Sequence, residues 1–275
     1  MDREHPRSGD VAVIGLGAMG GPIATHLARA GLRPWVVDLD ADRVAGCVRA
    51  GARATDLAGA ARAGVVLLMV PSDRDVRAVC LDHRFTGLLM AGAVLCIASS
   101  VQPETCSTVA AQAPQAAVLD TALTGGVRGA EAGMINLLVG GDLGALDRTR
   151  WALEPWTATI HHLGPLGAGQ IAKTCNNMLH WAQITAIAES LDLARRYGLS
   201  VPRVRAALLD SPVASRTLAE LEHMRLTWHA KDLANALAAG DAVGRELPVA
   251  HASQELMRDI TVEYLQELLG HESGT

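Results

Sequence analysis

The pattern of apolar and polar positions divides the chain into two parts with different secondary structure. In the first part, short runs rich in Val, Ile and Leu alternate with helix-like stretches, which is typical of a parallel sheet buried on both faces. The runs predict strands over Val11–Ile14, Trp35–Val37, Val65–Val70, Val94–Ala98, Ala117–Leu119, Ile135–Val139 and Thr159–Leu163. Among the stretches between them, the pattern predicts helices over Pro22–Ala30, Ala41–Ala50, Asp73–Leu81 and Pro103–Ala113. We therefore expect an α/β fold with a doubly wound, mostly parallel sheet of the Rossmann type.

The second part of the chain is predicted to be all α. Strand-like runs stop after Gly169, and Ile171–Tyr197 is typical of one long helix that ends at Gly198. Further helices are predicted over Pro202–Leu209, Ala214–Arg225, Trp228–Ala239 and Pro248–Leu268. The Gly- and Pro-rich segment 164–169 indicates a boundary. We expect a dinucleotide-binding domain over residues 1–165 and a helical domain over residues 166–275, which begins with the long interdomain helix.

Composition excludes several classes of protein. No apolar run approaches the roughly 20 residues that a membrane-spanning helix needs, and a net charge of −5 gives no reason to expect a nucleic-acid partner. The five cysteines lie far apart without a C-x-x-C pair, which favours reduced thiols in the cytoplasm. The neighbouring His161 and His162 lack metal-ligand spacing, so we predict no metal site.

Lysine is rare in this chain. Of the 24 basic residues, Lys173 and Lys231 are the two lysines and the others are arginines. Burial can lower the pKa of a lysine, whereas an arginine stays charged. The two positions that kept lysine are therefore candidates for a chemical role.

The first candidate site follows the first predicted strand. Gly15-Leu16-Gly17-Ala18-Met19-Gly20 has the spacing G-x-G-x-x-G and opens a helix, an arrangement that binds a pyrophosphate at the helix N-terminus. Asp38 ends the second predicted strand, where a carboxylate accepts hydrogen bonds from the adenosine ribose and repels a 2′-phosphate. The next basic residue, Arg43, is expected to face solvent. The pattern predicts NAD as the cofactor, in preference to NADP.

A second candidate site lies at Asp120-Thr121-Ala122-Leu123-Thr124-Gly125-Gly126, which we expect just past a strand end. The Thr124 hydroxyl and the backbone N–H groups of Gly125 and Gly126 could hold a carboxylate. An ordinary Gly-rich surface loop is the alternative, and the residues alone leave both open.

The third and fourth candidate sites contain the two lysines. Lys173 and Asn177 are four residues apart near the start of the long helix, so their side chains share one helix face. A lysine among apolar neighbours can act in proton transfer, although a lysine at a helix end more commonly extends into solvent. Lys231 and Asp232 are adjacent, and one or both could face the cleft between the domains; a solvated helix face is the alternative.

Taken together, the four segments resemble the β-hydroxyacid dehydrogenase family, which includes 3-hydroxyisobutyrate dehydrogenase and is related to 6-phosphogluconate dehydrogenase. The stretches G-L-G-A-M-G-G-P from Gly15, D-T-A-L-T-G-G from Asp120, G-A-G-Q-I-A-K-T-C-N-N from Gly167 and K-D-L from Lys231 are similar to its ordered motifs. The resemblance implies that Lys173 is catalytic with Asn177 beside it, and that Thr124, Gly125 and Gly126 hold the substrate carboxylate. It further implies cofactor contacts at Val70, Pro71, Ser100, Val101 and Lys231.

These expectations combine into one hypothesis. The chain is predicted to be an NAD-dependent oxidoreductase that transfers a hydride between nicotinamide and a small 3-hydroxy acid, with Lys173 as the acid/base. An imine reductase and a catalytically silent assembly module are the alternatives; retention of Lys173 speaks against both, and Asp38 against the imine reductases that prefer NADP. The apolar long helix in a small second domain also predicts a homo-oligomer.

Overall fold

The computed structural model describes residues 9–82 and 85–270. They form two compact units that divide between Lys173 and Thr174, within the long helix α9 (Ala168–Arg196). Each unit has its own hydrophobic core. Among the described residues, no helix combines the length and the apolar content needed to cross a membrane.

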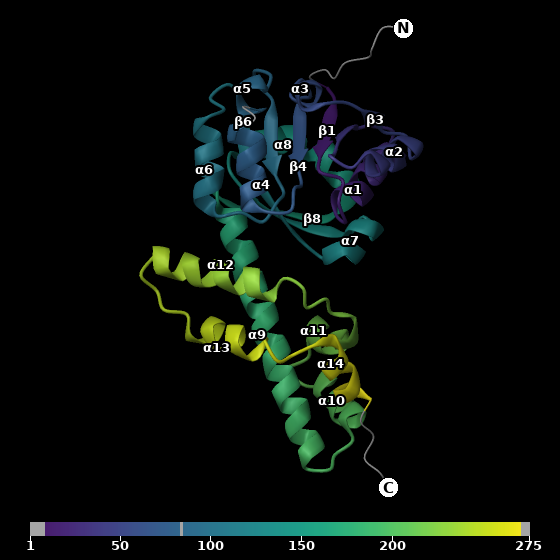
Figure 1. The fold of residues 1–275 in the computed structure, drawn as a ribbon, viewed down its shortest axis with the longest axis vertical. Helices are drawn as coiled ribbons and strands as arrows, with labels where there is room; N and C mark the ends of the chain where they lie inside the picture. Colours follow the sequence, from purple (N-terminus) through teal and green to yellow (C-terminus); the bar gives the residue numbers. More distant parts are fainter. Residues whose placement is uncertain (1–8, 83–84, 271–275) are drawn as a thin grey trace. The chain divides into compact units, whose positions relative to one another are not determined.

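An eight-stranded sheet with helices on both faces forms the first unit (Figure 1). The strand order is β3-β2-β1-β4-β5-β6-β7-β8, and every neighbouring pair is parallel except β6 and β7. The strands are β1 (Val11–Ile14), β2 (Trp35–Val37), β3 (Arg53–Ala54), β4 (Val65–Leu68), β5 (Val94–Ile97), β6 (Ala117–Thr124), β7 (Ile135–Gly140) and β8 (Thr157–Gly164). The expected mostly parallel, doubly wound sheet is confirmed.

The helices of the first unit follow these strands. They are α1 (Gly20–Arg29), α2 (Ala41–Arg49), α3 (Leu57–Ala60), α4 (Asp73–Arg77), α5 (Phe85–Leu88), α6 (Pro103–Ala111), α7 (Gly126–Ala132) and α8 (Leu143–Leu153). The helix expected over Asp73–Leu81 is α-helical only in its first part: α4 ends at Arg77, and a π-helical turn covers Ala78–Asp82.

Alternating side chains of the central strands divide the first unit's core into two layers. Val11 and Val13 belong to one layer, while Ala12 and Ile14 belong to the other. The same alternation continues along β4 and β5, because successive residues of a strand point to opposite faces. A strand buried on both faces needs apolar residues at every position, and this need explains the unbroken apolar runs of the sequence.

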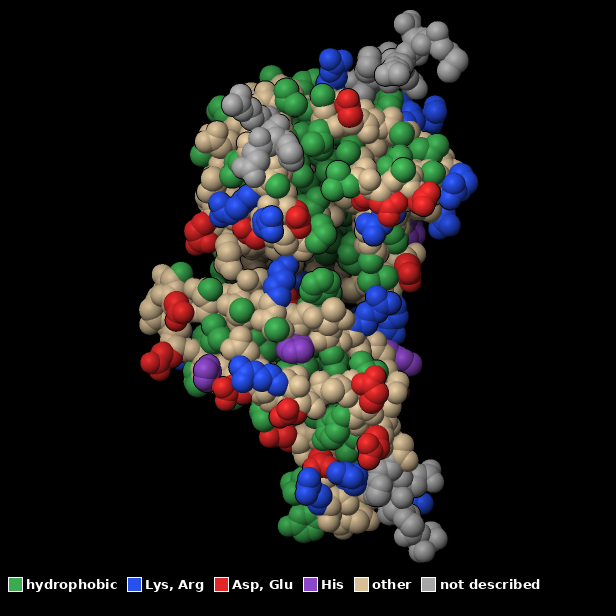
Figure 2. Space-filling model, in the orientation of Figure 1, with side chains coloured by type: hydrophobic (Ala, Val, Ile, Leu, Met, Phe, Trp, Pro, Cys, Tyr) green, Lys and Arg blue, Asp and Glu red, His purple; other side chains and the backbone are tan. Residues whose placement is uncertain are grey.

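The second unit is all helical and forms around α9 (Ala168–Arg196). Its further helices are α10 (Val201–Leu209), α11 (Arg216–Ala219), α12 (His229–Ala242), α13 (Pro248–Leu256) and α14 (Val262–Leu269). Trp181, Ile184 and Leu191 of α9 pack in one core with Leu233 of α12 and Leu265 of α14. On the face of the molecule shown in Figure 2, basic and acidic side chains are interspersed.

Two predicted helices of the second unit are wrong as single helices. The stretch Ala214–Arg225 contains only the four-residue α11 and a 3-10 turn over Leu221–His223. The stretch Pro248–Leu268 is divided into α13 and α14, and the Thr261 hydroxyl accepts a hydrogen bond from the backbone N–H of Tyr264 at 3.1 Å. This N-cap begins a new helix, because a threonine side chain can replace the missing backbone acceptor.

Candidate cofactor and catalytic site

The glycine-rich turn joins β1 to α1. Gly15 has a φ of +91°, a left-handed conformation that favours glycine, and its N–H donates to the Val37 carbonyl at 2.8 Å. A Cβ at Gly20 would collide with the Gly15 carbonyl, so the third glycine allows α1 to begin close to the turn. A Cβ at Gly17 would meet only the Arg43 guanidinium, 3.8 Å away. The backbone at Gly17 therefore remains approachable, and no side chain caps the N-terminus of α1. The turn fits the pyrophosphate of a dinucleotide.

Asp38 follows β2 and contacts this turn directly. Its carboxylate accepts hydrogen bonds from the backbone N–H of Leu16 at 2.5 Å and of Asp40 at 2.8 Å, and 10% of its side chain is exposed. The Arg43 guanidinium lies 4.0 Å from Asp38 and 3.2 Å from the carboxylate of Asp40. Arg43, in α2, has 53% of its side chain exposed, which confirms the expectation that it faces solvent; its contacts with Asp38 and Asp40 were not predicted.

The ends of β4 and β5 are joined by a buried serine. The backbone N–H of Val70 donates to the Ser99 hydroxyl at 2.9 Å, and this hydroxyl donates to the Leu68 carbonyl at 3.4 Å. Val70 and Pro71 follow β4, while Ser100 and Val101 follow β5. The carboxyl ends of neighbouring parallel strands are where open α/β sheets bind ligands. The structure thus brings these two predicted cofactor segments side by side.

Asp120 anchors the start of α9 to β6. Its side chain is fully buried, and its two oxygens accept the backbone N–H of Gly167 at 2.6 Å and of Gln170 at 2.7 Å. Burial raises the pKa of Asp120 above its usual range, although these backbone donors act in the opposite direction. A Cβ at Gly169 would lie 2.6 Å from the carboxylate, so glycine is needed there for the close approach. A buried carboxylate at a helix N-terminus also complements the helix dipole.

Thr124, Gly125 and Gly126 lie where β6 meets α7. The predicted end of this strand at Leu119 is wrong, since β6 continues to Thr124 by antiparallel pairing with β7. Thr124 is paired with Asn136 and its hydroxyl donates to the Asn136 carbonyl at 3.3 Å. Gly125 and Gly126 have φ angles of +114° and +62°. The predicted carboxylate site is therefore the end of a strand and a left-handed turn, and not a long loop.

The two lysines lie in different units. Lys173 is half-buried in α9, three residues after Gln170, and it closes the first unit. Asn177 belongs to the second unit, where it is 9% exposed and accepts a hydrogen bond from the Asn176 amide at 3.2 Å. Lys231, in α12, has its ammonium 6.0 Å from the centre of the Trp228 ring.

Asp232, the neighbour of Lys231, has a structural contact within the second unit. Its carboxylate accepts a hydrogen bond from the Trp181 indole of α9 at 3.1 Å. This bond joins α12 to α9, and it gives Asp232 a role in packing the helix that carries Lys231.

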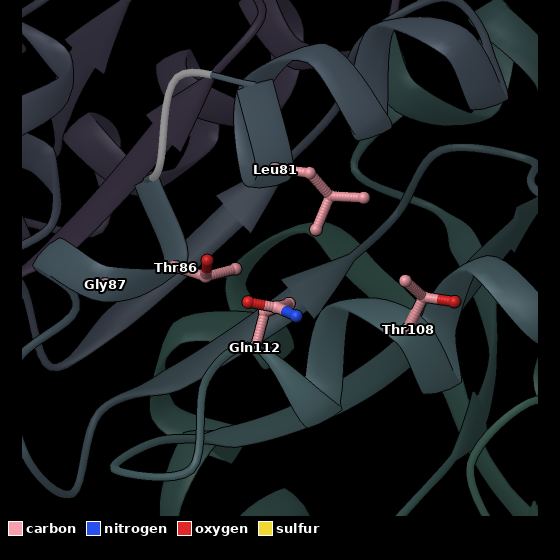
Figure 3. A pocket seen from close by; sticks show the side chains of 5 residues that line it. All are labelled: Leu81, Thr86, Gly87, Thr108 and Gln112. Carbon is pink, nitrogen blue, oxygen red and sulfur yellow. The ribbon is translucent and has the colours of Figure 1, made fainter.

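Other candidate sites are weaker. A pocket lined by Leu81, Thr86, Gly87, Thr108 and Gln112 lies at α5 and α6 (Figure 3) and contains none of the predicted site residues. Within residues 9–82 and 85–270, no three side chains of His, Cys, Asp or Glu gather closely enough to hold a metal ion. The glycine-rich turn and the strand ends beside it are therefore the site to which the sequence motifs and the structure both point.

The fold and this turn define a class of protein. A parallel sheet whose first βα turn contains three spaced glycines, and whose second strand ends in a carboxylate, is a Rossmann-type dinucleotide-binding domain. Residues 10–164 match the family model of the NAD-binding domain of 6-phosphogluconate dehydrogenase. Residues 167–271 match the model described as NAD-binding of NADP-dependent 3-hydroxyisobutyrate dehydrogenase. The chain belongs to the β-hydroxyacid dehydrogenase family.

The chain is also similar to individual dehydrogenases of this family. A 3-hydroxyisobutyrate dehydrogenase of Pseudomonas aeruginosa is 42% identical over 197 residues, which cover 69% of this chain and 65% of that relative. The solved 3-hydroxyisobutyrate dehydrogenase of Mycobacterium tuberculosis with L-serine is 27% identical, with a TM-score of 0.83 over 96% of this chain and 95% of that one. An imine reductase from Pseudomonas sp. has a TM-score of 0.65 at 19% identity over 95% of this chain and 99% of its own, and this likeness shows the fold alone.

Sequence interpretation missed Ser99 and Gln170 and assigned no role to Asp120. Asp120 interrupts the apolar strand β6, Ser99 follows the apolar strand β5, and Gln170 lies in the first turn of α9. All three are polar and buried. A buried polar side chain must find a hydrogen-bond partner. The partners lie up to 71 residues away in the chain, so no local pattern could identify them.

Proposed function

We propose that the protein is an NAD-dependent oxidoreductase that transfers a hydride between nicotinamide and a small 3-hydroxy acid. The observation that carries the proposal is that the start of α9, the helix of Lys173, is attached to β6 through Asp120 and to the segment after β5 through Gln170, in the same sheet whose strand β1 leads into the dinucleotide turn. This attachment gives the lysine a defined position in the unit that contains the turn. Lys173 is then available as a proton-transfer group in a site built for a dinucleotide.

In this proposal, the cofactor is held by the turn and by the strand ends. Gly15, Leu16, Gly17, Ala18, Met19 and Gly20 form the turn that takes the pyrophosphate, and Asp38 accepts the adenosine ribose hydroxyls. Val70, Pro71, Ser100 and Val101 contact the remainder of the dinucleotide, with Lys231 toward its nicotinamide end. When bound, the nicotinamide ring supplies the site with an acceptor or donor of hydride.

The compounds named with the relatives support the proposed substrate class. The Pseudomonas aeruginosa relative is named for 3-hydroxyisobutyrate, and the solved Mycobacterium tuberculosis structure is described with L-serine. Both compounds are short carboxylic acids with a hydroxyl on C3. Thr124, Gly125 and Gly126 would hold the carboxylate, which leaves the C3 hydroxyl for Lys173. In oxidation the neutral lysine takes the hydroxyl proton, and in reduction its ammonium returns a proton to the carbonyl oxygen. Asn177 orients these groups.

A substrate screen tests the proposal. Purified protein with NAD is offered 3-hydroxyisobutyrate, L-serine and other 3-hydroxy acids, and NADH absorbance is followed; NADH with cyclic imines forms a comparison arm. We expect turnover of at least one 3-hydroxy acid. Absence of turnover across the 3-hydroxy acids, or faster reduction of the imines, would contradict the proposed function.

Lys173→Ala tests the role of the lysine. Positioned proton transfer contributes about 10²- to 10⁴-fold in rate, so we expect turnover to fall by that order while NADH binding is retained. Lys173→Arg keeps the charge but cannot release a proton at neutral pH, and it should be nearly as inactive. Near-normal turnover in Lys173→Ala would remove this residue from the mechanism.

The compartment and assembly belong to the same proposal. The five cysteines are free thiols, four of them buried, which supports a reducing compartment such as the cytoplasm.

Leu179, Leu193 and Tyr197 of α9 are 58%, 58% and 79% exposed, which supports a homo-oligomer in which a second copy covers them. Light scattering measures the mass of the purified protein in solution, and the mass of a monomer would contradict the proposed homo-oligomer.

A further inference from the structure

Gln170 uses its side-chain amide to bind the segment that follows β5. Its Oε1 accepts the backbone N–H of Val101 at 3.1 Å, and its Nε2 donates to the Ser99 carbonyl at 2.9 Å. Both bonds are buried, since Gln170 is 2% exposed and Ser99 and Val101 are 5% and 6% exposed. The amide therefore pairs with residues i and i+2 of the segment in the way that a neighbouring strand would.

The backbone of Gln170 is held as firmly as its side chain. Its N–H donates to the Asp120 carboxylate at 2.7 Å, which attaches the first turn of α9 to β6. The Ser99 hydroxyl in turn accepts the N–H of Val70 after β4. One buried network thus joins the ends of β4 and β5, and Asp120 within β6, to the start of α9. Gln170 is the residue of α9 that makes these contacts to Asp120 and to the segment after β5.

We propose that Gln170 is a positioning residue that fixes the position of the Ser100–Val101 segment relative to Lys173. It thereby fixes the position of the nicotinamide end of the cofactor relative to the proton-transfer group. The inference rests on the proposed function, because that function assigns these two segments to the cofactor and to the proton. Gln170 itself contacts backbone groups and acts through them.

The physical consequence of losing the amide is local. Without it, the Val101 N–H and the Ser99 carbonyl would be buried and lack these partners, so the segment must move to reach water. Asp120 would still cap α9, and the turn at Gly15–Gly20 would be unchanged. The nicotinamide end of the site should therefore be perturbed while the adenosine end is preserved.

Gln170→Met tests this positioning role, since methionine has a similar length and shape but no amide. The ratio of the dissociation constants for NADH and for ADP-ribose is measured by fluorescence titration and calorimetry. ADP-ribose lacks the nicotinamide, so it reports on the adenosine end alone. We expect the ratio to rise, and kcat to fall at least about tenfold, because small misplacements of reacting groups cost about that much or more.

Gln115→Met is the matched control. Gln115 also lies in the first unit, and its Nε2 donates to the carbonyls of Thr86 and Leu89 at 2.7 and 3.2 Å, away from the strand ends of the site. Its loss removes two side-chain-to-backbone bonds of the same kind. We expect a loss of stability, with the NADH to ADP-ribose ratio and kcat unchanged.

These measurements distinguish a positioning role of Gln170 from a general loss of stability and from a failure of the proposed function. An unchanged ratio in Gln170→Met, or an equal change in Gln115→Met, would overturn the inference. If Gln170→Met does not fold, Gln170→Glu is measured in its place; it keeps an acceptor for Val101 and must raise the same ratio. If the wild-type protein turns over no 3-hydroxy acid, the proposed function fails, whereas the binding ratio still decides the role of Gln170.

Discussion

The backbone N–H of Leu16 donates a hydrogen bond to the carboxylate of Asp38, with 2.5 Å between nitrogen and oxygen. The same carboxylate accepts the N–H of Asp40. Asp38 therefore holds the glycine-rich turn in shape in addition to its proposed role with the adenosine ribose. The Arg43 guanidinium lies 4.0 Å away, so a cation is present beside this carboxylate.

Asp38→Ala should narrow the preference for NAD over NADP. The carboxylate repels a 2′-phosphate, and its loss leaves Arg43 available to attract one. We expect the ratio of kcat/KM values for the two cofactors to fall at least about tenfold, equivalent to about 1.4 kcal/mol. Steady-state kinetics with both cofactors measures this ratio.

The double variant Asp38→Ala/Arg43→Met is the control for this interpretation. It lacks the carboxylate and the cation, so NADP should gain less than in the single variant. Equal gains in both variants would show that Arg43 has no part in the change, and tighter binding of NADP than NAD by the wild-type protein would contradict the predicted cofactor itself.

Thr121→Val should stabilise the protein. Thr121 is fully buried in β6, and within the part of the chain that the structure describes its hydroxyl is the buried side-chain group that lacks a hydrogen-bond partner. Valine has the same shape without the polar atom, so we expect the free energy of unfolding to rise by about 1 kcal/mol. Urea unfolding measures the change.

Thr149→Val is the matched comparison for Thr121. Thr149 is equally buried in α8, but its hydroxyl donates to the Leu146 carbonyl at 2.8 Å. Its replacement should lower the free energy of unfolding by about 1 kcal/mol. Changes of the same sign in the two variants would refute the difference in hydrogen bonding on which the prediction depends.

Asp73 should contribute stability that is lost in acid. Burial acts to raise the pKa of Asp73, but hydrogen bonds from Thr105, Arg77 and the Gln102 N–H outweigh it and hold the pKa below its usual value. A carboxyl whose pKa is lower in the folded state stabilises the protein above its unfolded pKa of about 3.9 and loses that effect as the pH falls through the folded value.

Comparison of the wild-type protein with Asp73→Asn measures this contribution. The difference in the free energy of unfolding should be largest at neutral pH and should shrink as the pH falls below about 4. Arg77→Met removes the cation and should move the loss to higher pH. A difference that does not depend on pH would show that the Asp73 charge makes no contribution.

Thiol reagents should modify Cys175 in the native protein. Cys175 is exposed, whereas Cys47, Cys80, Cys96 and Cys106 are buried. Burial raises the pKa of Cys80 and of Cys96 to about 12, which leaves almost no reactive thiolate at neutral pH. We expect one fast-reacting thiol per chain, which Cys175→Ser should abolish. More than one fast thiol in the native state would contradict the burial of the others.

The strands of the sheet were the most predictable elements. β1, β2, β4 and β5 follow from apolar runs, because a strand covered on both faces needs an apolar side chain at every position. β6 was predicted too short, because Asp120 and Thr121 are polar and buried, and only the antiparallel partner β7 extends the strand past them. A change of strand direction leaves no mark in local hydrophobicity.

Local sequence is sufficient to specify the parallel sheet, the glycine-rich turn and the acid that follows β2, since each depends on residues close in the chain and on backbone conformations that few residue types allow. The cap that Asp120 of β6 provides for α9, and the contact of Gln170 with the segment after β5, become visible in the folded chain alone. These contacts satisfy buried polar groups across long separations in sequence. Their partners are therefore chosen by the packing of strands and helices, which no stretch of the chain encodes alone.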